Sequence, residues 1–236
     1  MSSFLYAVLA AAGNLVGAAA VTARSRWSPR NLEVLLALAA GFLVVVSLVG
    51  LLPEAIERGG REAALIVLLG FLLVHLTQHA LVGHFHFGEE THQVTRAVSL
   101  SALVGLLLHT FVDGVAIASA FEVSEELGAL VFGAVFLHKV PEGLAIASLW
   151  IASGRSRASA LGAAAALAIA TLLGFAFTAI VDPLAHWGLA LSAGVTLYVG
   201  ASNLIPEFQG KAGWTHNAVF FLGCGLALAL RSALGH

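Results

Sequence analysis

Long apolar runs separated by short polar connections make up the chain along its whole length. A helix needs roughly 20 apolar residues to cross a bilayer, and this pattern predicts eight such helices. The connections carry most of the charged residues and leave no room for a soluble domain. We therefore expect an all-α membrane protein with a single transmembrane domain over residues 1–236. The predicted spans are at about 4–22, 32–56, 62–83, 97–121, 127–151, 158–181, 186–208 and 213–233.

The overall composition supports the membrane assignment. Hydrophobic residues make up 59% of the chain and charged residues only 10%, with a mean hydropathy of +0.96. A soluble domain is usually about one quarter charged. The net charge of −2 argues against a nucleic-acid partner. The lone cysteine, Cys224, excludes a disulfide within the chain and a cysteine-rich metal site.

The positive charges of the connections predict the orientation of the helices. Eight spans place both termini on the same side of the membrane. The connections on one side hold seven Lys and Arg residues and those on the other side three, and the richer side is expected to face the cytoplasm. Both termini are therefore predicted to be extracytoplasmic. The seven are Arg24, Arg26, Arg30, Arg96, Arg155, Arg157 and Lys211, and the three are Arg58, Arg61 and Arg231.

Two matching hexapeptides interrupt the apolar sequence of the fourth and fifth spans. They are HTFVDG (109–114) and HKVPEG (138–143). In each, a histidine stands four residues before a carboxylate, His109 before Asp113 and His138 before Glu142. Residues four apart lie on the same face of a helix. Each span is therefore predicted to present one imidazole and one carboxylate together.

The short connection EVSEE (122–126) makes these two spans antiparallel neighbours. Both pairs lie 11 to 18 residues from its middle, so they are expected near the bilayer centre at almost the same depth. Charges are costly in hydrocarbon, and a bound divalent cation would offset that cost. Two nitrogen and two oxygen donors suit tetrahedral Zn²⁺ and other first-row ions. We predict a metal site formed by His109, Asp113, His138 and Glu142.

A fainter repeat links the second and seventh spans. GFLVVVSLVGLLPE (41–54) and GVTLYVGASNLIPE (194–207) share a glycine followed at the same distance by Pro-Glu. The two spans are predicted to cross the membrane in opposite directions. Spans 1–3 and 6–8 therefore form a predicted inverted repeat around a central hairpin of spans 4 and 5, a plan common among transporters.

The two hexapeptides resemble the paired motifs H-N-x-P-E-G and H/Q-x-x-P-E-G of the ZIP (Zrt-, Irt-like protein) family of divalent-metal transporters. LLPEAIE (51–57) and LYVGASNLIPE (197–207) extend the resemblance to the whole chain. The resemblance implies a 3+2+3 arrangement, extracytoplasmic termini and a multi-pass protein of the plasma membrane. It also implies a secondary carrier that imports metal into the cytoplasm by alternating access. Zn²⁺ is the main expected cargo, and Fe²⁺, Mn²⁺, Co²⁺ and Cd²⁺ are alternatives.

This sequence departs from the family at the second ion position. Many members bind a second ion with the residues after each motif histidine and an acid on the sixth span. Here those positions hold Thr110 and Lys139, and the sixth span (158–181) has no acid. We expect the ammonium of Lys139, three residues before Glu142, to replace the second cation and leave a single-metal site. Val112 also stands where the family usually has proline.

Other polar residues are candidates for an ion pathway. His75 and His79 share a face at the inner end of the third span, and three more histidines lie in the following loop. The resemblance implies that this loop handles metal leaving the pore. Glu54 and Glu207 are expected to line the outer and inner mouths, and Asn14 to form an interhelical hydrogen bond. The loop histidines are His84, His86 and His92.

Two other functions are compatible with a buried His/carboxylate site. An intramembrane hydrolase would use the metal to activate water, but it needs an open coordination position and a general base, and the chain has no H-E-x-x-H motif. A metal-selective channel is the other alternative. The favoured carrier is not an enzyme and needs no catalytic residue and no organic cofactor. Its expected partners are metal ions and the lipid bilayer, with a homodimer as the candidate assembly.

Overall fold

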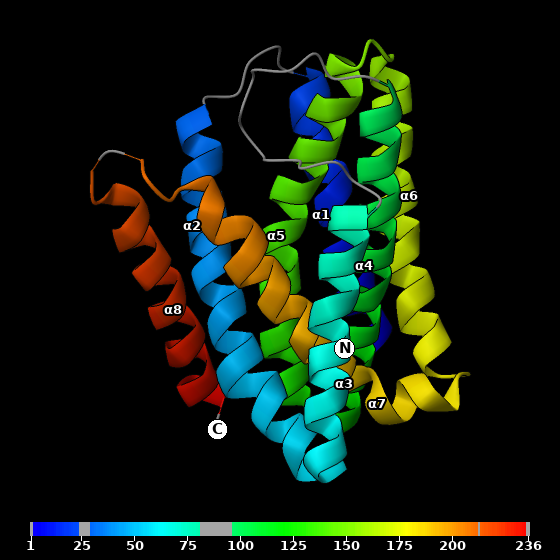
Figure 1. Ribbon diagram of the computed structural model, residues 1–236, viewed down its shortest axis with the longest axis vertical. Coiled ribbons are helices and arrows are strands. Elements are labelled where there is room, and N and C mark those ends of the chain that lie inside the picture. Colours follow the sequence, from blue (N-terminus) through cyan, green and yellow to red (C-terminus); the bar gives the residue numbers. More distant parts are fainter. Residues whose placement is uncertain (1, 24–28, 81–95, 212, 235–236) are drawn as a thin grey trace.

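The computed structural model describes residues 2–23, 29–80, 96–211 and 213–234 (Figure 1). These residues are almost entirely helical, and none of them lies in a β-strand. The elements are α1 (Ser3–Ala23), α2 (Pro29–Val45), η1 (Val46–Leu51), α3 (Leu52–Ala80), α4 (Arg96–Val123), α5 (Glu125–Ala152), α6 (Arg157–Thr178), α7 (Asp182–Tyr198), η2 (Val199–Leu204), η3 (Ile205–Glu207) and α8 (Thr215–Leu234).

The helices confirm a multi-pass membrane protein. Seven helical stretches among the described residues are long and apolar enough to cross a membrane. The longest, Glu33–Thr77, has 45 residues, about twice the length of one crossing. It reverses direction at Gly60, where φ is 57° (Figure 1), so this stretch supplies two of the predicted spans. The other helix bounds lie within a few residues of the predicted ones.

The connection between α4 and α5 is reduced to a single residue, Ser124. Its side-chain oxygen accepts a hydrogen bond of 3.1 Å from the backbone N–H of Leu127, which satisfies one of the free donors at the helix start. Glu125 and Glu126 occupy the first turn of α5, where negative charge is favourable. This tight, capped turn holds α4 and α5 antiparallel and fixes their relative depth.

The helices pack in two groups. The first comprises α1, α4, α5 and α6, and the second comprises α2 with η1, α3, α7 with η2, and α8. The closest pairs are α1 with α5, α4 with α6, α3 with α7, and α2 with α8. In Figure 1, α8 lies along one side of the bundle and α6 along the other.

Glycines let the backbones of paired helices touch within each group. A Cβ atom at Gly114 of α4 would collide with the carbonyl oxygen of Thr171 in α6, and one at Gly174 of α6 would collide with that of Phe111 in α4. Small residues of this kind are typical where membrane helices approach closely. The contacts between α1 and α5 have the same form, with Gly143 against the carbonyl of Asn14 and Gly17 against that of Val140.

Replacing Gly174 with alanine should destabilise the protein, because α4 and α6 would have to separate to admit the new methyl group. Overpacking of this kind typically costs about 1–3 kcal/mol. Gly162 on the same helix is the matched control, since a Cβ atom there meets nothing within 4 Å. Thermal denaturation in detergent should show a lower midpoint for Gly174→Ala and an unchanged or higher one for Gly162→Ala. Equal midpoints would contradict the close contact.

Two π-helical turns occupy the same position in the two halves of the fainter repeat. These are η1 and η2, which fall at matching places within segments 41–54 and 194–207. Such turns are rare in proteins, and those that occur often lie at functional sites. The side-chain oxygen of Ser47 in η1 donates a 2.8 Å hydrogen bond to the carbonyl of Ala193 in α7, which ties the two halves together. The full 3+2+3 assignment stays a prediction.

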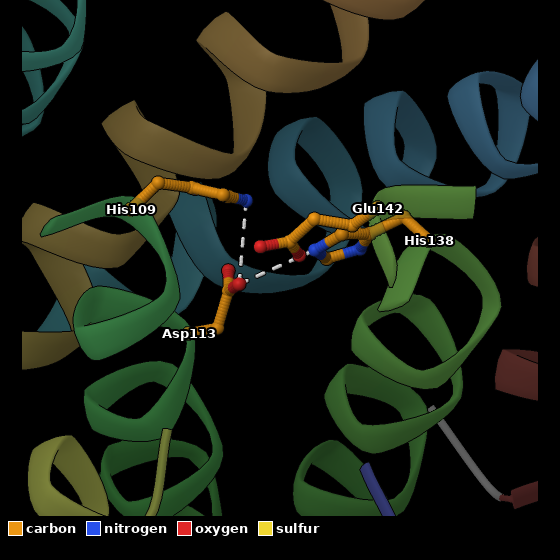
Figure 2. A group of neighbouring side chains, drawn as sticks. All are labelled: His109, Asp113, His138 and Glu142. Carbon is orange, nitrogen blue, oxygen red and sulfur yellow. Dashed lines mark hydrogen bonds and ion pairs between the residues drawn. The ribbon is translucent and has the colours of Figure 1, made fainter. Parts of the chain in front are cut away.

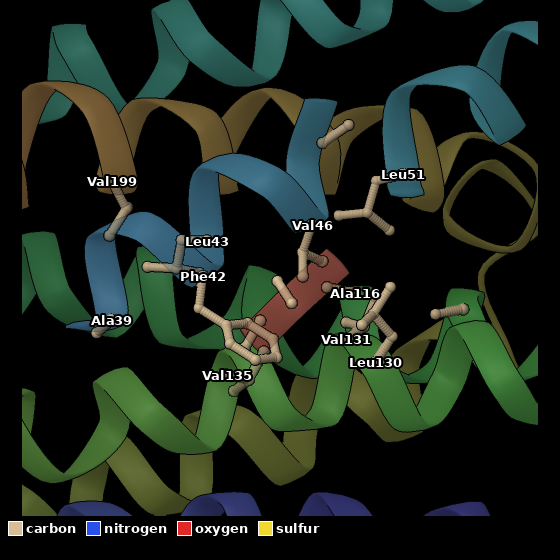
Figure 3. Packing of buried hydrophobic residues seen from close by; sticks show 14 of the residues in the cluster. Ala39, Phe42, Leu43, Val46, Leu51, Ala116, Leu130, Val131, Val135 and Val199 are labelled. Carbon is tan, nitrogen blue, oxygen red and sulfur yellow. The ribbon is translucent and has the colours of Figure 1, made fainter. Parts of the chain in front are cut away.

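An apolar layer lies between the two groups (Figure 3). In the largest buried cluster, Phe42 and Val46 of α2 and η1 pack with Leu130 and Val131 of α5. Side chains rather than backbones meet here, since a Cβ atom at Gly133 would find Phe42 at an ordinary contact distance of 3.6 Å. At Gly133 the two groups therefore meet less closely than the paired helices within them, whereas Gly188 of α7 packs tightly against the side chain of Ser119 in α4.

Candidate metal centre

Four predicted site residues come together in the middle of α4 and α5. His109 and Asp113 project from α4, and His138 and Glu142 from α5, toward one another (Figure 2). One donor atom from each lies within 4.8 Å of all the others. Their side chains are buried, with exposures between 2 and 8%. The i, i+4 spacing places each pair on one helix face, and the single-residue turn brings the two faces to one level.

Asp113 is the centre of the group. Its Oδ2 atom lies 3.3 Å from Nε2 of His109 and 3.3 Å from Nε2 of His138. A tetrahedral Zn²⁺ with bonds of about 2.0–2.2 Å has ligand atoms about 3.3–3.6 Å apart. The two separations fit two edges of such a tetrahedron, whereas the wider ones, up to 4.8 Å, would have to shorten by roughly 1 Å around an ion.

The two imidazoles are held differently. Nδ1 of His138 lies 2.9 Å from the carbonyl oxygen of Ala134. Since a carbonyl only accepts, Nδ1 donates this bond and Nε2 is left free for a metal, as is usual for metal-binding histidines. Nδ1 of His109 is buried and meets no hydrogen-bond partner among the described residues. The imidazole of His138 is therefore held in one orientation, whereas within the described residues no hydrogen bond at Nδ1 fixes that of His109.

Lys139 is a fifth charged member of the cluster. It is fully buried, and its Nζ atom lies 2.7 Å from Oδ2 of Asp113 and 2.8 Å from Oε2 of Glu142. The sequence predicted its proximity to Glu142 but not the contact with Asp113, which crosses from α5 to α4. The ammonium therefore binds both carboxylates at once. With neutral imidazoles, the cluster keeps one net negative charge, which favours a cation.

Thr110 fixes the other oxygen of Glu142. Its hydroxyl donates a 2.6 Å hydrogen bond to Oε1 of Glu142, and its side chain is fully buried. With Lys139 on Oε2, both oxygens of this carboxylate are engaged. The two residues that follow the motif histidines thus contact the carboxylates of the four-residue group directly.

The remaining candidate residues lie outside this cluster. Nδ1 of His75 is 3.3 Å from the hydroxyl of Tyr198, Glu54 pairs with Arg58 at 3.0 Å, and Glu207 is buried in η3. Among the residues that the structure describes, none of these joins the four-residue group. The side chain of His79 and the whole of His84, His86 and His92 lie outside the described part of the chain.

The interhelical hydrogen bond expected for Asn14 is not found among the described residues. Asn14 is fully buried in α1, and neither amide atom of its side chain has a hydrogen-bond partner within the described part of the chain. The physical reason is the close contact with α5. Here the backbone carbonyl of Asn14 rests against Gly143, which has no side chain that could meet the amide.

The sequence of this chain is similar to those of known proteins. The family model described as ZIP zinc transporter matches residues 77–231, which include the whole cluster. Zinc transporter ZIP9 of Micropogonias undulatus is 31% identical over 167 residues, covering 64% of this chain and 53% of that protein. ZIP9-A of Xenopus laevis is 28% identical (72% and 64% covered), and ZIP13 of Pongo abelii is 29% identical (78% and 61% covered). The chain therefore matches only about half to two thirds of the length of these relatives.

Proposed function

The chain belongs to the ZIP zinc transporter family, and we propose that it is a secondary carrier that imports divalent transition-metal ions into the cytoplasm. Zn²⁺ is the proposed cargo, because the relatives are named as zinc transporters and the donor set suits this ion. Fe²⁺, Mn²⁺, Co²⁺ and Cd²⁺ are further candidates for the same donors. The observation that carries the proposal is the buried His/carboxylate group inside a multi-pass bundle.

The site is proposed to hold one ion at a time through His109, Asp113, His138 and Glu142. Lys139 puts a positive charge where a second ion would need a ligand, and in the ion-free protein this charge lies 2.7 Å and 2.8 Å from the two carboxylates. A second divalent ion would lack a ligand at this position, and like-charge repulsion in a buried site opposes its binding.

Burial of the ligands favours a carrier with alternating access over a channel. With exposures of only 2 to 8%, the four side chains cannot exchange an ion with either side unless helices move. We propose that α1, α4, α5 and α6 move as a block against the second group. The glycine contacts within each group and the apolar layer between the groups support this division.

Membership of a transporter family separates this chain from the hydrolase alternative, because the relatives are named as transporters and not as enzymes.

The import direction rests on the proposed orientation in the plasma membrane. Arg155 donates a 3.4 Å hydrogen bond to the carbonyl of Arg96, and Arg157 donates one of 3.2 Å to that of Thr22. These contacts gather three arginines at one end of the bundle, as the positive-inside rule predicts for a cytoplasmic face. We therefore propose that both termini are extracytoplasmic.

Uptake of radiolabelled Zn²⁺ into proteoliposomes tests the carrier directly. The wild-type protein should show saturable uptake without any added substrate, and His138→Ala should reduce it to background, because the fixed imidazole ligand is lost. His186→Ala is the matched control, since His186 is exposed at the start of α7. Uptake by His138→Ala at the wild-type rate, or no uptake by the wild type, would contradict the proposal.

A further inference from the structure

Asn14 of α1 is a buried polar residue that lies outside the proposed metal site. Its side chain has no exposed surface, and within the described ranges both amide atoms lack a hydrogen-bond partner. An unsatisfied amide in an apolar interior is destabilising, so a residue of this kind is expected to find a partner in another state of the protein.

The packing of α1 places Asn14 beside Lys139. A Cβ atom at Gly13 would lie 2.9 Å from Cβ of Lys139, and the carbonyl of Asn14 rests on Gly143. The two helices run in the same direction (Figure 1), and side chains on a helix lean toward its N-terminus. The amide of Asn14 therefore leans back toward the level of Gly13, where the stem of Lys139 leaves α5.

A metal ion and the ammonium of Lys139 require the same oxygen atoms. Nζ contacts Oδ2 of Asp113, the atom that both imidazoles also approach, and Oε2 of Glu142. A divalent ion bound by these oxygen atoms would stand beside the ammonium, which is tethered and fully buried, and like-charge repulsion at this distance would displace it. The displaced charge then needs a new acceptor inside the protein, since leaving it unpaired is strongly unfavourable.

Few buried acceptors are free to receive it. Among the described residues, the buried side-chain oxygens without a hydrogen-bond partner are Oδ1 of Asn14 and Oγ of Ser119. A Cβ atom at Gly188 of α7 would lie 2.5 Å from Oγ of Ser119, which places that hydroxyl at the boundary with the second helix group. Asn14 belongs to the interface that contains the stem of Lys139.

We propose that Oδ1 of Asn14 accepts the ammonium of Lys139 when the transported ion enters the site. Lys139 is then a built-in cation that alternates between the two carboxylates and Asn14. It compensates the carboxylates when the carrier is empty and leaves them when a divalent ion arrives. This inference rests on the proposed function, because it gives Asn14 a role in the binding of the transported ion.

Zn²⁺ binding to the purified protein in detergent, measured by calorimetry, tests the exchange through a double-mutant cycle. Asn14→Leu keeps the approximate volume and removes the acceptor, so it should weaken Zn²⁺ binding about tenfold or more, the usual effect of losing a hydrogen bond to a charged group. In a Lys139→Met background no ammonium is displaced, and Asn14→Leu should have little effect. An equal loss in both backgrounds, or no loss in the wild type, would overturn the proposal.

A measurement without metal separates this inference from the proposed function. Asn14→Leu should leave the thermal denaturation midpoint of the ion-free protein unchanged or raised, because it replaces an amide that has no hydrogen-bond partner among the described residues. A lower midpoint would mean that Asn14 has a structural partner in the empty state, and the inference would fail. Absence of Zn²⁺ binding by the wild type would instead contradict the proposed function, and the ion-free result would still decide whether Asn14 is unpartnered.

Discussion

Replacing Asp113 with asparagine should abolish Zn²⁺ uptake and weaken Zn²⁺ binding by at least about 100-fold, because changes to residues that merely support metal ligands already cost 10–100-fold. Oδ2 of Asp113 is the atom that His109, His138 and Lys139 all approach. Asparagine would remove its negative charge and leave Lys139 paired with Glu142 alone. The cluster would then have no net negative charge to attract a cation. Uptake into proteoliposomes and calorimetry measure the two effects.

Asp182→Asn provides the matched control for this experiment. It makes the same chemical change at an exposed position in the first turn of α7, outside the cluster. Its uptake should equal that of the wild type. Size-exclusion chromatography of Asp113→Asn should show a folded protein, since Lys139 retains the Glu142 carboxylate 2.8 Å away. Saturable uptake by folded Asp113→Asn would remove Asp113 from the site.

The helical layout could be predicted from the sequence because hydropathy and chain length determine it directly. A bilayer requires long apolar helices and leaves few alternatives for the connections between them. The polar stretch between the second and third predicted spans indicated the turn at Gly60. In the structure this turn lies inside α3, where only Gly60 departs from helical backbone angles. The π-helical turns were not predictable, because they depend on how neighbouring helices accommodate one extra residue.

The four-residue group could be predicted because helix periodicity and a short turn fix both face and depth. The contact between Lys139 and Asp113 could not, because it depends on how α4 and α5 rotate about their own axes. Nor could the sequence show that the side chain of Asn14 has no hydrogen-bond partner among the described residues. The backbone of Asn14 lies against Gly143, and such contacts follow from the packing of whole helices rather than from the pattern of one segment.

Replacing Lys139 with methionine should destabilise the ion-free protein strongly while leaving it able to bind Zn²⁺. The ammonium lies within 2.8 Å of both carboxylates and is fully buried. Removing one partner of a buried ion pair typically costs about 3–5 kcal/mol, since the remaining charge is uncompensated. Here two carboxylates would face each other without a cation. The thermal denaturation midpoint without metal should therefore fall well below that of the wild type.

Added Zn²⁺ should recover much of this loss, because a divalent ion supplies the missing positive charge and stabilises the folded state by mass action. The Zn²⁺-dependent rise in the midpoint should accordingly be larger for Lys139→Met than for the wild type. Lys211→Met is the control, because Lys211 pairs with Glu33 at 3.1 Å with 46% of its side chain exposed, and exposed pairs contribute about 0–1 kcal/mol. An ion-free Lys139→Met protein as stable as the wild type would show that the lysine does not compensate the carboxylates, and its proposed replacement of a second cation would be wrong.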